Sequence, residues 1–120
     1  MNMASLTKGA GLGTILQILM VVVGHFMSPE QQGMLFPIAG TLLGIVTGWL
    51  SADGTRAMPL GSTATQGAVA GGVAGVLGSL VSTALGDVPL GNIAIAGGST
   101  LVAGAIGAAI ARAMSPASAR

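Results

Sequence analysis

The sequence predicts an all-α, polytopic membrane protein with four transmembrane helices arranged as two helical hairpins. Three observations predict this fold. Only 6% of the 120 residues are charged, while 52% are hydrophobic and 21 residues are glycine. The apolar residues fall in four charge-free runs, each close to the about 20 helical residues that cross a hydrocarbon core of about 30 Å. Short polar segments rich in glycine and proline separate these runs.

The charge content excludes several classes of protein. A soluble domain carries about 25% charged residues, whereas this chain has four basic and three acidic residues in total. Four cations are too few to neutralise a run of phosphates, so nucleic acid is excluded as a partner. The absence of cysteine removes disulfides and thiolate ligands. We expect a single transmembrane domain over residues 1–120, with the lipid bilayer as its main partner.

The first hairpin is predicted from two runs, at about 9–27 and 34–52. The first run is dense in Leu, Ile and Val, and a polar segment with Pro29 and Glu30 ends it. Lys8 before this run would also suit a signal peptide, but no small-residue cleavage site follows it, so we expect the segment to be retained. The second run contains Pro37, which we place in the first turns, where its missing N–H is tolerated.

The second hairpin is predicted from runs at about 66–85 and 91–112. The longest polar stretch, about 53–65, divides the two hairpins, and a tight break around Gly86, Asp87 and Pro89 separates the last two helices. With four spans, every basic residue falls on one side of the membrane: Lys8, Arg56, Arg112 and Arg120. The positive-inside rule therefore places both termini and the central loop in the cytoplasm. We expect the protein in a bacterial cytoplasmic membrane.

Small residues recur at spacings that place them on one helix face. Hydrophobic burial cannot drive helices together in lipid, so close contact between small residues has to do so. The predicted packing residues, in a glycine-zipper pattern, are Gly40, Gly44, Gly48, Gly71, Gly75, Gly78 and Gly107. Packing within the chain is the first interpretation, and self-association or docking to other transmembrane subunits is the alternative. On the first helix, a narrow line through Thr14, Gln17, Gly24 and Ser28 interrupts the bulky residues, which predicts a peripheral helix.

His25 is the one ionisable side chain inside a predicted span, and such groups are candidates for function. A neutral imidazole could be the axial ligand of a haem or a (bacterio)chlorophyll, or relay protons. A lone membrane histidine resembles that of photosynthetic antenna polypeptides, although Val21 stands where those chains usually have a small residue. A bound lipid is a further candidate for a cofactor. The alternative is a histidine at the headgroup boundary that bonds to water or a loop carbonyl. An unchanged absorption spectrum in His25→Ala would count against the ligand interpretation.

The remaining polar residues do not form a catalytic pattern. Glu30, Asp53 and Asp87 fall in three different loops, and no Walker loop or Ser/His/Asp set is present, so we expect no enzyme. The seven methionines are dispersed, which disfavours a metal pathway. The sequence favours a non-catalytic accessory subunit of a larger membrane complex, for instance a photosynthetic or respiratory assembly. The alternative is a small oligomeric pore, a holin-like protein or a passive transporter.

Overall fold

The structure is a computed structural model that describes residues 2–52 and 58–115. It contains four helices, α1 (Met3–His25), α2 (Pro29–Ser51), α3 (Leu60–Ala84) and α4 (Asn92–Ala113). All four are long and apolar enough to cross a membrane, and helices of this size measure about 33–38 Å. The all-helical class and the number of apolar helices predicted from the sequence are therefore confirmed. The predicted loop residues Asp53 and Arg56, and the terminal Arg120, lie outside the described residues.

Three helices begin earlier than the apolar runs suggested. They start at Met3, Pro29 and Leu60 rather than at about residues 9, 34 and 66. For α1 and α2 the reason is a side-chain cap, which lets the helix begin before the apolar run; α3 begins after Pro59 without a side-chain cap. The Asn2 side chain accepts a hydrogen bond from the backbone N–H of Ser5. Ser28 and Gln31 form a reciprocal capping box at the start of α2.

Pro37 does not lie in the first turns of its helix, as the sequence analysis placed it. Because α2 begins at Pro29, Pro37 is an interior residue two turns further on. Proline has no N–H, so the carbonyl of Gly33, four residues earlier, lacks its usual helical donor. An interior proline in a transmembrane helix is tolerated where other polar groups are close by.

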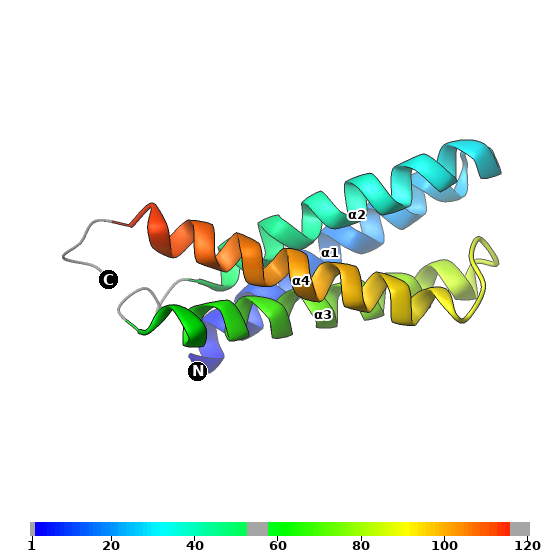
Figure 1. Cartoon of the computed structure of the whole chain (residues 1–120). Helices are drawn as coiled ribbons and strands as arrows, with labels where there is room; N and C mark the ends of the chain where they lie inside the picture. The colour runs from blue at the N-terminus through cyan, green and yellow to red at the C-terminus, as the bar shows by residue number, and fades with distance from the viewer. Residues whose placement is uncertain (1, 53–57, 116–120) are drawn as a thin grey trace.

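The helices run alternately up and down, so that the start of α1 and the end of α4 lie at the same end of the bundle (Figure 1). We call this end, where α1 and α3 begin and α2 and α4 finish, the terminal end. The opposite end, with the α1–α2 and α3–α4 connections, is the loop end. α3 packs most extensively against α4, and α1 contacts α2 and α3 but not α4. From the middle of the bundle toward the loop end, α2 and α4 separate (Figure 1).

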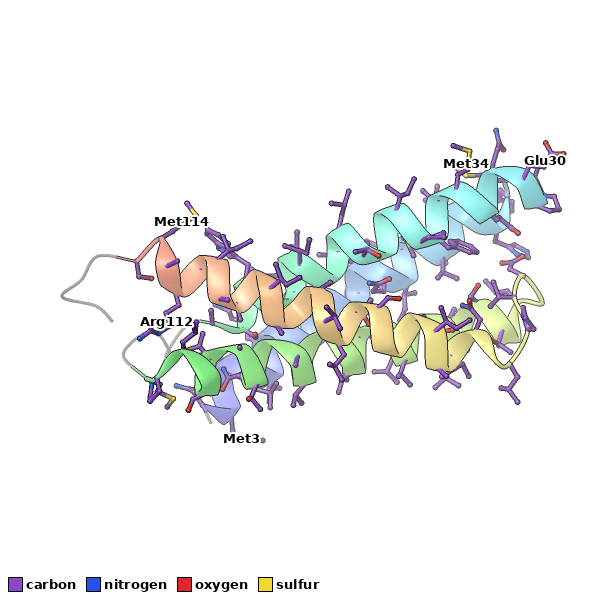
Figure 2. The ribbon with its side chains drawn as sticks, viewed as in Figure 1. Met3, Glu30, Met34, Arg112 and Met114 are labelled. Atoms are coloured by element: carbon purple, nitrogen blue, oxygen red, sulfur yellow. The ribbon has the colours of Figure 1, made fainter. Side chains whose placement is uncertain are left out.

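The distribution of side chains is the reverse of that in a soluble bundle. The largest fully buried side chains are all polar, namely Gln66, Thr47, Thr63 and Ser51. Large apolar side chains point outward instead, as Figure 2 shows along every helix, and Ile38 is 60% exposed. Soluble proteins rarely expose extended apolar surface. The described surface is therefore suited to hydrocarbon rather than to water.

The packing face of α1 differs from the predicted one. Its buried residues are Leu6, Gly9, Gly13, Gln17, Val21 and Gly24. Thr14 and Ser28, which the sequence analysis placed on the same line as Gln17, are not among them. A Cβ atom on Gly9 would meet Ser51 of α2, and one on Gly13 would overlap Thr47. Two glycines of α1 thus admit α2 to close contact, and α1 also packs against α3, although it does not contact α4.

Candidate functional site

A cavity of about 330 Å³ opens at the loop end, and all four helices line it. It lies where α2 and α4 separate (Figure 1). Its apolar walls include Met20 and Val21 of α1, Phe36 of α2 and Ile95 of α4. The polar side chains that line it are Gln17, Gln32, Thr41, Ser79, Ser82, Asp87, Asn92, Ser99 and Thr100. A cavity that mixes apolar walls with several polar groups has the composition of a small-molecule site.

The end of α3 positions the one charged residue of this lining. Gly86 has φ of +80°, which favours glycine. Its N–H donates to the carbonyl of Thr83 at 3.0 Å, and the N–H of Asp87 donates to the carbonyl of Ser82 at 3.1 Å. These two bonds form a Schellman motif, which folds the chain back over the last turn of the helix. Asp87 is held against the helix end rather than extended into solvent.

The Asp87 carboxylate links the two connections of the loop end. His25 Nδ1 lies 3.0 Å and 2.9 Å from its two oxygens, and Gln32 Nε2 donates to Oδ1 at 3.2 Å. The same Gln32 nitrogen donates to the carbonyl of Gly24 at 2.9 Å. The carboxylate side chain is only 9% exposed, while the imidazole is 38% exposed. Residues from α1, α2 and the α3–α4 connection therefore meet at one acidic group.

Two other polar groups show how the inner cavity is built. Gln17 is 3% exposed, and its Nε2 donates to the carbonyl of Gly40 at 3.0 Å, joining α1 to α2. Ser82 is 2% exposed, and its hydroxyl has no hydrogen-bond partner in the described structure. A buried hydroxyl without a partner costs free energy. The Ser82 hydroxyl therefore remains available to a molecule in the cavity.

His25 lies at the last position of α1, at the rim of this site. Nδ1 is engaged by Asp87, which leaves Nε2 for any further ligand. A carboxylate that holds one imidazole nitrogen is a common way to orient the other. The cofactor interpretation of His25 therefore remains a hypothesis. Its partner Asp87 was missed at the sequence level, although both residues lie beside loops that the charge pattern placed on the same side.

The glycines predicted to pack helices lie in contacts of very different tightness. A Cβ on Gly48 would overlap the backbone of Gly104 in α4, whereas a Cβ on Gly44 would lie 3.0 Å from the Ala103 Cβ. On Gly40 it would lie 3.7 Å from the nearest side-chain atoms, those of Gln17 and Met20. The distance between α2 and its neighbours therefore increases from the terminal end toward the cavity.

The other predicted glycines also face neighbouring helices. Gly71 and Gly75 lie against Thr100 of α4, and Gly78 lies against Gln17 of α1. Gly107 lies against the backbone of Ile45 in α2. Gly104 was not in the predicted set, yet it approaches both Gly48 and Gly67. The sequence could not single it out, because many small residues share its helix.

A buried hydrogen-bond network joins helices at the terminal end. Gln66 is fully buried, and its Nε2 donates to the carbonyl of Ser51 at 2.6 Å. Its Oε1 accepts the backbone N–H of Asn2 at 2.7 Å. One side chain of α3 thus satisfies backbone groups at the end of α2 and the start of α1, and no comparable link closes the cavity between α2 and α4 in the described residues.

No protein-family model matches this chain, and neither a curated protein nor a solved structure matches it. The cavity's own chemistry is therefore the basis for a functional proposal.

Proposed function

We propose that the protein is a non-catalytic integral membrane protein that admits a small solute into the bilayer-spanning bundle, in the manner of a passive transporter. The observation that carries this proposal is the cavity of about 330 Å³ with polar walls. Polar groups in hydrocarbon are costly unless something satisfies them. Sites for small molecules measure about 300–1,000 Å³, so this cavity suits a small solute.

In this proposal the chain inserts as two helical hairpins that pack through their Gly- and Ala-rich faces. Lys8 and Arg112 lie toward the terminal end, while Glu30 and Asp87 lie at the loop end (Figure 2 labels Arg112 and Glu30). The positive-inside rule then supports a bacterial cytoplasmic membrane with both termini in the cytoplasm. The cavity opens toward the opposite face, and the tight contacts at the terminal end separate it from the cytoplasm.

Liposome swelling tests the transport proposal. The full chain is reconstituted, and the entry of glycerol, urea and small ammonium salts is followed by light scattering against protein-free liposomes. We expect entry of at least one of these small solutes and retention of a large dye such as carboxyfluorescein. Dye release would instead indicate a wide, holin-like pore. Absence of both kinds of flux would contradict the transport proposal.

A matched pair of variants links any flux to the cavity. Gly40→Leu places a bulky side chain beside the cavity, where a Cβ has room, so the bundle is expected to fold. Gly11→Leu adds the same side chain to α1 at a position where a Cβ meets nothing within 4 Å. We expect the first variant to slow solute entry severalfold and the second to leave it unchanged. Equal rates in both would separate the flux from the cavity.

The second candidate function is an accessory subunit of a larger membrane complex. An apolar groove on the outer surface of α3 and α4 favours it, because small residues there let another helix approach closely. The groove is lined by Val69, Gly72, Val73, Ala94, Gly98 and Leu101, among others. Purification in mild detergent tests this role: comigration with pigmented or haem-containing subunits would support it. A colourless protein that migrates alone would count against it.

A further inference from the structure

We infer that the cavity at the loop end selects a small organic ammonium cation, with Asp87 as its counter-ion. This inference rests on the proposed transport function and names its class of solute. Asp87 is the only formally charged residue among those that line the cavity. The described basic residues Lys8 and Arg112 lie toward the opposite end of the bundle. The cavity therefore carries one negative charge with no formal positive charge in its lining.

Two side chains hold and orient the Asp87 carboxylate, His25 and Gln32. Gln32 is a neutral donor, and so is His25 when its imidazole is in the uncharged form with the proton on Nδ1. A carboxylate has about four lone-pair positions, so two donors leave acceptor capacity for a ligand. A side chain only 9% exposed has lost most of its hydration, which strengthens its attraction for a cation.

Two oxygen atoms at the cavity add to the acceptor capacity of Asp87. The buried Ser82 hydroxyl lines the cavity and has no partner. Ser82 is also joined to Asp87 through the backbone, because the N–H of Asp87 donates to the Ser82 carbonyl. Gly33 and Pro37 also line the cavity, and Pro37 deprives the Gly33 carbonyl of its helical donor. An ammonium group, which only donates hydrogen bonds, matches these acceptors.

The remaining walls favour an organic cation over a bare metal ion. Among the described residues, no group of three or more His, Cys, Asp or Glu side chains could hold a metal. A hard divalent cation takes about six to eight oxygen ligands, commonly with several carboxylates. Met20, Phe36 and Ile95 offer apolar surface instead. A cation with a short alkyl chain uses both parts of the site.

The inference is tested by calorimetric titration of the full chain in detergent micelles, with empty micelles subtracted. The probes are propylammonium chloride and its neutral counterpart propionamide. A charge-assisted hydrogen bond predicts about tenfold or tighter binding of the cation. Asp87→Asn keeps the shape of the side chain and is expected to abolish this preference. Glu30→Gln removes an exposed carboxylate at the same end, outside the cavity lining, and is expected to keep it.

Equal affinity of the wild type for the two probes, or a preference that survives in Asp87→Asn, would overturn the inference. If Asp87→Asn does not fold, Ser82→Ala tests the cation site instead. The Ser82 hydroxyl has no hydrogen bond within the described structure, so this variant is expected to fold. We expect this variant to bind propylammonium about threefold more weakly, and unchanged affinity would overturn the inference. Binding without flux in liposomes would refute transport and retain the cation site. Flux without a cation preference would retain transport and refute the cation site.

Discussion

At the terminal end the helices approach until their backbones meet, whereas at the loop end α2 and α4 separate around a cavity. Both ends use the same kinds of residue. Gly48 at the terminal end lies against the backbone of Gly104, while a Cβ on Gly40 near the cavity would make only ordinary van der Waals contacts. The buried Gln66 links backbone groups of two other helices, and Gln17 links only α1 to α2 beside the cavity. Small and polar residues thus close one end and line a cavity at the other.

The largest effect is expected when alanine replaces two glycines of α2, one at the terminal end and one near the cavity. Gly48→Ala forces a Cβ into the Gly104 backbone, which cannot move aside as a side chain can. We expect a loss of about 3 kcal/mol or more in the free energy of unfolding, at the upper end for overpacking. Gly40→Ala is expected to change it by less than about 0.5 kcal/mol. Unfolding in mixed micelles with increasing SDS measures both, and equal losses would remove the distinction between the ends.

A second comparison replaces the two buried glutamines. Gln66→Leu leaves the Ser51 carbonyl and the Asn2 N–H without their partner, and an unsatisfied buried group costs about 1–3 kcal/mol. Gln17→Leu removes only an additional bond to the Gly40 carbonyl, which lies in the middle of α2 and keeps its helical donor, beside the cavity. We expect about half the loss for this variant. The same SDS titration measures it, and the opposite order would show that the loop end is the more tightly specified.

Two glycines of α1 provide a smaller and local test. Gly13 lies against the fully buried Thr47, whereas a Cβ on Gly11 would meet nothing within 4 Å. Gly13→Ala is expected to destabilise by about 1–2 kcal/mol, because Thr47 has to shift. Gly11→Ala is expected to be neutral or slightly stabilising, since alanine favours helix over glycine by about 1 kcal/mol. Thermal unfolding followed by circular dichroism is the measurement. Loss of stability in Gly11→Ala would show that another molecule covers that face.

The smallest effect on global stability is expected at the rim of the cavity. His25→Ala removes an imidazole that is partly exposed, and a hydrogen bond from such a side chain contributes about 1 kcal/mol or less. The local effect is larger, because the α3–α4 connection loses its link to α1. We expect faster amide hydrogen exchange over residues 85–91 in this variant. His25→Gln, which can still donate to Asp87, is expected to restore slow exchange, and faster exchange in both variants would assign the effect to some other property of the imidazole.

The helical class, the number of apolar helices and the gathering of the basic residues at one end of the predicted helices could be read from the residues alone. Charge and hydropathy are properties of the chain, and hydrocarbon leaves few other structures to an apolar run of this length. Helix starts were less predictable, because Asn2 and Ser28 extend the helices beyond the apolar runs through local caps. Gly104 could not be distinguished among the many small residues of α4.

Which small residues meet backbone and which border a cavity depends on how the helices are placed in space. Gly40, Gly44 and Gly48 look alike in the sequence, but the divergence of α2 from α4 gives them different neighbours. The tertiary structure also brings His25 and Gln32 to Asp87, although they are separated from it by 62 and 55 residues along the chain. The physical reason is that helix packing in lipid depends on the relative position of whole helices, which no local pattern of residues specifies.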